Sequence, residues 1–187
     1  LQLMPGLPGD TPETFQETVS QVIALRPEFV RIYPALVIKD TPLAELYRTG
    51  RYSPLSLEDA VLLCRTAVAR FEQAGIEVIR VGLQPTAELE RPGAIIAGPW
   101  HPAFRQLVES ARFLETMSSL LPCGSMSGAV IFFVNPADLS SAVGQKRRNI
   151  RTIKDRYGRD ARIMADPAVP RGAVRKESSC NAARVGL

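Results

Sequence analysis

Short apolar segments alternate with amphipathic helices along the first 83 residues of the chain. The segments 1–5, 29–38 and 76–83 have the length and composition of strands, and helices are expected between them. The segment 29–38 is apolar on both faces, which is typical of a strand buried in a parallel sheet. The order strand, helix, strand, helix, strand therefore predicts an α/β fold.

Composition argues against a membrane-spanning chain and against a metal site. The 187 residues are 45% apolar and 22% charged, and no apolar run approaches the roughly 20 residues that cross a bilayer. Cys64, Cys123 and Cys180 are widely spaced and there is one histidine, so no metal-ligand spacing is present. We therefore expect no metal site and no membrane partner. Scattered thiols favour a reducing compartment, and a cytoplasmic protein is expected.

Charge divides the chain unevenly. Residues 124–187 hold 12 lysines and arginines against 5 acidic residues, whereas residues 1–123 hold 11 against 14. The Pro, Gly and Ser content of 123–128 is typical of a linker, which predicts a domain of residues 1–122 and a small basic α/β module of residues 129–187. In that module strands are expected at 130–135, 161–165 and 173–176, a helix at 140–157, and a frayed C-terminus at 178–187.

Charged side chains occur inside two of the expected strands. Arg31 precedes Tyr33 in one strand, and Arg80 lies in the next. A buried charge costs free energy unless it is paired, so these strands are expected to open onto a polar barrel lumen or a ligand. An edge strand that is wetted on one side is the alternative. Both arginines are candidates for the substrate side of a site.

Two loops offer candidate functional groups. Gly6 lies between a strand and a helix in a loop whose amides could face an anion, although an ordinary turn is the favoured interpretation. Trp100 and His101 are the only residues of their kinds and share a proline-flanked loop. They are substrate-side candidates for stacking and proton transfer. Alternatively, Trp100 fills a core edge and His101 bonds to the backbone.

A run of cations marks the expected helix of the basic module. It comprises Lys146, Arg147, Arg148 and Arg151. Cations at this density suit contact with RNA phosphates, but no aromatic stacking residues alternate with them. The run can equally be a solvated helix face. Nucleic-acid binding by these four residues is therefore a hypothesis that rests on charge.

Several motifs together resemble the radical S-adenosylmethionine superfamily. They are Leu3-Met4-Pro5-Gly6-Leu7-Pro8-Gly9, Arg31-Ile32-Tyr33-Pro34-Ala35-Leu36-Val37-Ile38, Thr41-Pro42-Leu43 and Gly50-Arg51-Tyr52. They look like the catalytic subunit of Elongator and its bacterial relatives, and the first motif also resembles coproporphyrinogen dehydrogenase-type enzymes. This resemblance covers residues 1–83. The segments 98–102 and 145–149 look like the C-terminal extension of bacterial members.

The resemblance implies a fold and cofactors. The chain would be the C-terminal portion of a partial TIM-type (β/α)6 barrel, with residues 1–5 as the fifth strand and 29–38 as the sixth, followed by a small α/β accessory module. The intact family enzyme holds S-adenosylmethionine and a [4Fe–4S] cluster, the latter in a C-x-x-x-C-x-x-C loop. No cysteine here has that spacing, so the cluster ligands and the first four strands are expected to be missing.

The resemblance also assigns roles to residues. Gln2 and Met4 would contact the adenosine of S-adenosylmethionine, and Gly6 would allow the backbone to approach it closely. Tyr33 and Ala35 would lie near the adenine or the substrate entrance.

By this resemblance the parent protein is a radical S-adenosylmethionine oxidoreductase, which cleaves its cofactor reductively and abstracts hydrogen through a 5′-deoxyadenosyl radical. The chain alone is expected to be inactive, with a missing N-terminal barrel half or a complementing chain as its partner. The main alternative is a non-catalytic tRNA-binding module that uses the basic helix within residues 140–160. A stand-alone α/β enzyme that uses His101 is a third hypothesis.

Overall fold

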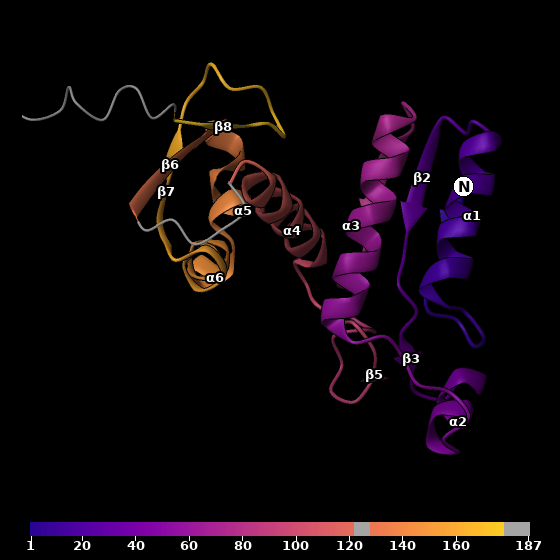
Figure 1. Cartoon of the computed structure of the whole chain (residues 1–187). Coiled ribbons are helices and arrows are strands. Elements are labelled where there is room, and N and C mark those ends of the chain that lie inside the picture. The colour runs from indigo at the N-terminus through magenta and orange to yellow at the C-terminus, as the bar shows by residue number, and fades with distance from the viewer. Residues whose placement is uncertain (122–127, 178–187) are drawn as a thin grey trace, which may run out of the picture. The chain divides into compact units, whose positions relative to one another are not determined.

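The computed structural model describes residues 1–121 and 128–177, which fall into two compact units, Leu1–Val108 and Glu109–Leu187 (Figure 1). Of the predicted linker, residues 123–127 lie outside the described residues, and so does the predicted frayed segment 178–187. The predicted domain boundary after residue 122 stays a prediction. The division between the two compact units falls inside helix α4 (Phe104–Ser119).

A parallel three-stranded sheet forms the centre of the first unit. Its strands are β1 (Gln2–Leu3), β2 (Phe29–Ile32) and β4 (Glu77–Val81), in the order β1-β2-β4. The connections carry α1 (Pro12–Ala24) and α3 (Leu57–Gln73), which pack against each other. The predicted α/β fold with helix-connected parallel strands is therefore confirmed for this unit.

Local sequence signals explain where the two helices begin. Thr11 caps α1, because its hydroxyl accepts a hydrogen bond from the Thr14 N–H at 3.2 Å. Pro12 fits the first turn, where no N–H donor is needed. Ser56 caps α3 in the same way by accepting from the Asp59 N–H at 3.0 Å.

One face of the sheet is apolar and buried. Leu3, Val30, Ile32, Val78 and Val81 are each at most 5% exposed. Removing side chains of this kind from water stabilises the fold by about 1.5–3 kcal/mol each. Side chains alternate along β1 and β2, so Gln2 and Arg31 point to the other face of the sheet. In β4 an irregularity in the pairing at Val30 and Arg31 leaves Ile79 without a partner and makes Arg80 level with Arg31.

The predicted strand 29–38 is wrong in its second half. β2 stops before Pro34, and a separate strand β3 (Val37–Ile38) pairs antiparallel with β5 (Ile95–Ala97). Proline has no N–H to donate to a sheet ladder, which explains the interruption. The prolines and glycines of residues 84–102 favour a loop, yet β5 lies inside this segment.

Two further helices complete the first unit. α2 (Pro42–Arg48) follows β3 and begins at Thr41, whose hydroxyl accepts a hydrogen bond from the Ala44 N–H at 3.3 Å. α4 begins at Phe104 and continues into the second unit. No helix in the described ranges is long and apolar enough to cross a membrane.

The second unit is a smaller α/β fold. Its central strand is β6 (Gly128–Val134), which runs parallel to β7 (Arg159–Ala165) and antiparallel to β8 (Val174–Lys176). α6 (Arg148–Tyr157) packs against β7. Phe132 on the central strand is fully buried in the core of this unit.

The single helix predicted over residues 140–157 is wrong in its middle. The structure has α5 (Leu139–Val143), preceded by the 3-10 turn η1 (Pro136–Asp138) and followed by the 3-10 turn η2 (Gln145–Arg147), before α6 begins. Gly144, with φ of 75°, ends α5 in a backbone conformation that favours glycine.

A buried asparagine accounts for this break. Asn149 is 2% exposed, and its amide donates hydrogen bonds of 2.9 Å to the carbonyl oxygens of Ser110 and Ala142. A Cβ on Gly144 would lie 2.8 Å from the Ser110 hydroxyl oxygen, so the chain passes too close to α4 for a larger residue. The interruption is therefore set by contacts with a distant helix rather than by local periodicity.

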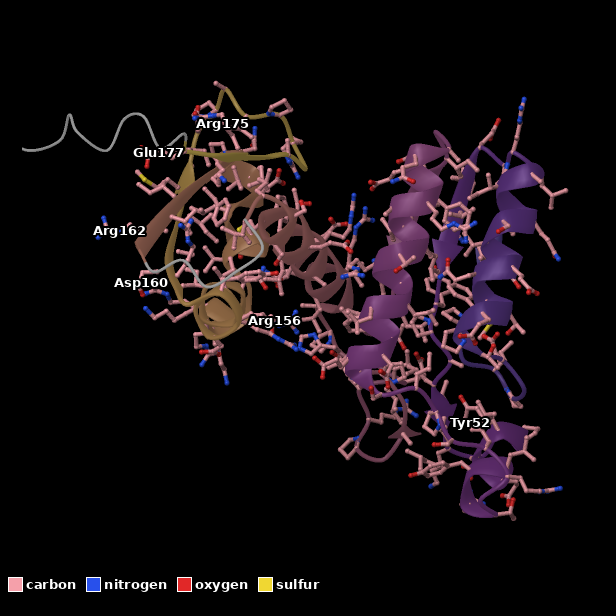
Figure 2. The ribbon with its side chains drawn as sticks, in the orientation of Figure 1. Tyr52, Arg156, Asp160, Arg162, Arg175 and Glu177 are labelled. Atoms are coloured by element: carbon pink, nitrogen blue, oxygen red, sulfur yellow. The ribbon has the colours of Figure 1, made fainter. Side chains whose placement is uncertain are left out.

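Tyr52 fixes the loop between β1 and α1. It is 8% exposed, and its hydroxyl donates a hydrogen bond of 2.5 Å to the Gly6 carbonyl oxygen (Figure 2). Asp10 closes the same loop, because its carboxylate accepts from the Gly6 N–H at 2.8 Å and from the Thr14 hydroxyl at 2.7 Å. Burial first, and then the charge of Asp10, raise the pKa of Tyr52 above its ordinary value of 10.0.

We predict that Tyr52→Phe lowers the free energy of unfolding by about 1 kcal/mol, because the Gly6 carbonyl loses its partner. A raised folded-state pKa means that the contribution of Tyr52 is complete below the unfolded pKa and is lost as pH rises through the folded pKa. Urea unfolding followed by circular dichroism, between about pH 8 and pH 11, should therefore show the gap between wild type and variant closing at alkaline pH. Tyr47→Phe, at a more exposed site on α2, is the control. A gap that widens with pH would contradict this assignment.

Candidate functional site

Three polar side chains form a row across the parallel sheet. Gln2 on β1 is level with Arg31 on β2, and Arg31 is level with Arg80 on β4. Residues level with each other on neighbouring strands project to the same side of a sheet, and strands lie about 4.8 Å apart. Leu3 and Ile32, the next residues along β1 and β2, are buried on the opposite side. We call the side that carries the row the open face.

Within the described residues, the two arginines of the open face have no acidic partner. Arg31 is exposed and Arg80 is half-buried. Across residues 1–121 and 128–177, neither guanidinium takes part in an ion pair or a side-chain hydrogen bond. β2 lies between β1 and β4, so the edge-strand alternative does not apply to Arg31, whereas β4 is an edge strand of the sheet within the described residues and the alternative stands for Arg80.

A hollow of about 320 Å³ adjoins the carboxyl end of β4. Its lining includes Arg80 and Arg105, the second residue of α4. Arg105 donates a hydrogen bond of 3.1 Å from Nη1 to the Ile79 carbonyl oxygen. Gly82, with φ of 79°, lets Phe104 pack close, since a Cβ there would lie 2.8 Å from the Phe104 side chain.

In the loop after β1, the backbone polar groups of Gly6 already have partners within the protein. Met4 is 42% exposed beside the row, whereas the N–H and carbonyl of Gly6 bond to Asp10 and Tyr52. A Cβ on Gly6, whose φ is 86°, would lie 2.8 Å from Leu55 Cδ1, so packing alone requires glycine here. With the Gly6 amide engaged by a carboxylate, the ordinary turn favoured from sequence describes this loop better than an anion-binding loop.

Tyr33 and Ala35 follow β2 and are buried, at 9% and 2% exposure. The Ala35 N–H donates to the Pro5 carbonyl oxygen at 2.9 Å, which brings the segments after β1 and β2 together. A Cβ on Gly98 would lie 3.1 Å from the Ala35 carbonyl oxygen, so the loop with Trp100 also passes here. The sequence-predicted residues of the first unit therefore gather at the carboxyl ends of the parallel strands.

His101 bonds to the backbone, which was the alternative to a substrate-side role. Its Nδ1 accepts a hydrogen bond of 3.0 Å from the Ala103 N–H, and its carbonyl accepts from the Phe104 N–H at 3.0 Å. This leaves Nε2 as the ring nitrogen that carries the proton in neutral histidine. Trp100 beside it is half-buried.

The cations predicted to bind nucleic acid lie in the second unit as a group of their own. Lys146, Arg147, Arg148 and Arg151 are exposed, in the turn before α6 and in its first turn. Lys146 and Arg147 have φ of 49° and 60°, a left-handed conformation that is uncommon for residues other than glycine.

The described residues do not fit an iron–sulfur cluster. No group of three or more His, Cys, Asp or Glu side chains suited to a metal ion occurs among them. Cys64 is fully buried in α3, and burial raises its pKa to about 12, which opposes formation of the thiolate that a metal needs. Cys123 and Cys180 lie outside the described residues.

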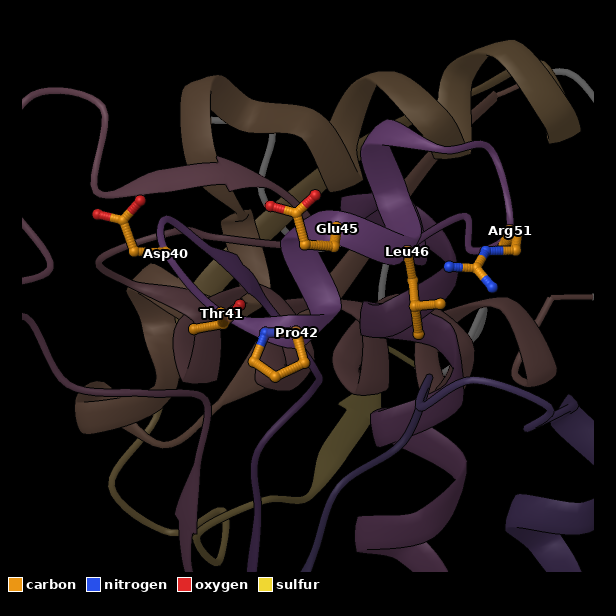
Figure 3. A pocket seen from close by; sticks show the side chains of 6 residues that line it. All are labelled: Asp40, Thr41, Pro42, Glu45, Leu46 and Arg51. Atoms are coloured by element: carbon orange, nitrogen blue, oxygen red, sulfur yellow. The ribbon is translucent and has the colours of Figure 1, made fainter.

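A second hollow, of about 630 Å³, lies beside α2 (Figure 3). Its lining comprises Asp40, Thr41, Pro42, Glu45, Leu46 and Arg51. The hollow is wide open, and its rim carries both signs of charge: the carboxylates of Asp40 and Glu45 and the guanidinium of Arg51. None of the site residues predicted from sequence lines it.

Sequence reasoning missed Arg105 and Tyr52 as parts of this region. Arg105 follows the Trp100 and His101 loop, but its approach to β4 depends on the tertiary fold. Tyr52 belongs to a motif that carries the resemblance, yet its bond to Gly6 spans 46 residues. Only the tertiary structure brings each of them to the ends of the strands.

Comparison with known proteins identifies the region. Residues 27–112 match the Radical_SAM C-terminal domain. The tRNA uridine(34) acetyltransferase of Methanocaldococcus jannaschii is 37% identical over 62 residues, which are 32% of this chain and 12% of that protein. The protein with the same name from Methanocaldococcus infernus is 36% identical over 62 residues, again 32% and 12%.

A third relative, an uncharacterised protein of Methanocaldococcus jannaschii, is 42% identical over 50 residues, which are 27% of this chain and 16% of that protein. The matches thus span only a small part of each relative's length. The domain match includes β2, α3 and β4 with Arg31 and Arg80. The resemblance found in the sequence motifs is confirmed for this part of the chain: residues 27–112 are similar to the C-terminal domain of radical S-adenosylmethionine proteins.

Proposed function

We propose that the chain is part of a radical S-adenosylmethionine enzyme that modifies tRNA. The observation that carries the proposal is the match of residues 27–112 to the Radical_SAM C-terminal domain, because it covers two of the three parallel strands and the Trp100 and His101 loop. The names of the two archaeal relatives supply the substrate class. The proposed reaction type and the proposed substrate therefore rest on different findings, and an experiment can contradict one without the other.

In this proposal β1, β2 and β4 are consecutive strands of a partial (β/α)6 barrel. Their parallel order and their helical connections suit such a barrel, in which helices cover the outside. The open face would then be the lumen side. Functional residues of barrel enzymes lie at the carboxyl ends of the strands, where the predicted residues of this unit gather.

S-adenosylmethionine would bind at the end of β1. The exposed side chains of Gln2 and Met4 are free to contact its adenosine, the first by hydrogen bonds and the second by packing. Tyr33 and Ala35 are buried, so they would shape the floor of the site rather than reach into it. When bound, S-adenosylmethionine supplies the radical chemistry of this superfamily.

The cluster would be held by residues outside those described here. The buried, protonated Cys64 does not suit it, and no acid and histidine group among residues 1–121 and 128–177 does. We therefore propose that catalysis needs a C-x-x-x-C-x-x-C segment from the parent protein or a complementing chain. The described residues would orient the cofactor and the substrate and exclude water.

Binding of the nucleoside part of the cofactor can be tested without the cluster. Saturation-transfer difference NMR detects weak ligands, and S-adenosylhomocysteine is a stable probe. We expect transfer to its adenine and ribose protons with the 187-residue chain, and loss of most of it in Gln2→Ala. Gln21→Ala, an exposed glutamine on α1, is the matched control. No transfer, or equal transfer in both variants, would contradict the assignment.

A second candidate function is tRNA binding by the basic unit. The observation that favours it is the exposure of Lys146 and Arg147 in the turn before α6 and of Arg151 in the helix itself. Cations that contact phosphates release counterions from RNA, and this makes affinity depend on salt. Such binding would serve the proposed enzyme or act without catalysis.

We predict that replacing Lys146, Arg147 and Arg151 with glutamine weakens binding of an anticodon stem–loop RNA. Fluorescence anisotropy at several salt concentrations should show a slope of log affinity against log salt that is shallower by about 2–3, since each phosphate contact contributes roughly 0.9. Glutamine at Arg26, Lys39 and Arg91, three exposed cations of the first unit, is the control. An unchanged slope in the first variant would exclude this surface from RNA binding.

A further inference from the structure

The pair of arginines on the open face is unfavourable in the absence of a ligand. The register holds Arg31 and Arg80 level on neighbouring strands, and like charges in that arrangement repel each other. Glu77 is the one acidic residue of β4, and it is level with Phe29 rather than with either arginine. Strands with this register therefore present two guanidiniums to an outside anion.

A third cation and a hollow continue this arrangement. Arg80 lines the hollow of about 320 Å³, and Arg105 lines it too, held by its bond to the Ile79 carbonyl oxygen. No acidic residue is part of the lining. Gln84 lines the hollow with an exposed amide, and the positive end of the 16-residue helix α4 adds to the potential there.

The chemistry of the three arginines favours a phosphate. A guanidinium is a planar fork of five N–H donors that matches two phosphate oxygens at once, and its charge does not titrate at physiological pH. Arg80 and Arg105 line one hollow, and Arg31 is level with Arg80 on the neighbouring strand, outside the lining. The hollow is at the lower end of the size range of small-molecule sites, with room for a phosphate and part of an attached nucleoside.

We propose that Arg31, Arg80 and Arg105 form a phosphate-binding site on the open face, and that its occupant is a backbone phosphate of the RNA substrate. The identity of the occupant rests on the proposed function, whereas the binding of phosphate does not. The site would hold the RNA backbone beside Gln2 and so fix which nucleotide reaches the carboxyl end of β1.

The binding site can be tested with inorganic phosphate and the full 187-residue chain. We expect phosphate, exchanged for chloride at constant ionic strength, to raise the melting temperature by about 3–6 °C at ten times its dissociation constant. Arg31→Gln with Arg80→Gln should abolish this rise. The double variant should fold, with a melting temperature in chloride at least equal to that of wild type, because the repulsion is relieved. Arg26→Gln with Arg91→Gln, exposed cations of the same unit, should keep the rise.

The source of the phosphate needs a separate experiment. An anticodon stem–loop RNA should lose about tenfold in affinity in the Arg31 and Arg80 variant, and inorganic phosphate should compete with it on wild type alone. A phosphate effect without this loss would overturn RNA as the occupant, while the phosphate site would stand. No phosphate effect on wild type, or an equal effect on the double variant, would overturn the site itself. None of these results depends on cofactor binding, so a failure here is distinct from a failure of the proposed enzyme.

Discussion

The parallel pairing of β2 with β1 and β4 is the constraint on which the first unit depends. The pairing, which shifts register once between Val30 and Arg31 of β2, sends Leu3, Ile32 and Val81 into the core and sends Gln2, Arg31 and Arg80 to the open face. A shift by one residue would bury arginine and expose the core, at a cost of several kcal/mol per charge. Stability and site are thus two consequences of the same backbone alignment.

The second unit is organised around a buried polar contact instead. The Asn149 amide, near the start of α6, donates to the Ser110 carbonyl oxygen on α4, and the neighbouring cations Lys146, Arg147 and Arg148 are exposed. A second buried polar residue, Asp138, is 6% exposed and accepts from the Gly172 N–H at 2.8 Å and from Arg171 at 2.7 Å. These hydrogen bonds from Asn149 and to Asp138 stabilise segments that lack the repeating backbone hydrogen bonds of a helix or a strand.

The sequence predicts the parts of this structure that local patterns control. The alternation of strands and helices, the capped helix starts and the motifs around Gly6 and Tyr33 led to the α/β fold and the superfamily. The break at Gly144 was not predicted, although glycine is a residue that commonly ends helices; the buried contact beside it, from Asn149 to Ser110, spans 39 residues. For the same reason the approach of Arg105 to β4 could not be read from composition, since apolar and charged periodicity carry no information about tertiary neighbours.

The register of β1 against β2 is tested most directly by disulfide cross-linking. In a variant whose native cysteines are serine, Gln2→Cys with Arg31→Cys should oxidise readily, because cysteines level on neighbouring strands fall within the Cα separation of about 4.4–6.8 Å that a disulfide needs. Leu3→Cys with Arg31→Cys should not, since these side chains point to opposite faces. If the second pair cross-linked preferentially, Gln2 and Arg31 would not share a face of the sheet, and the proposed phosphate site would be contradicted.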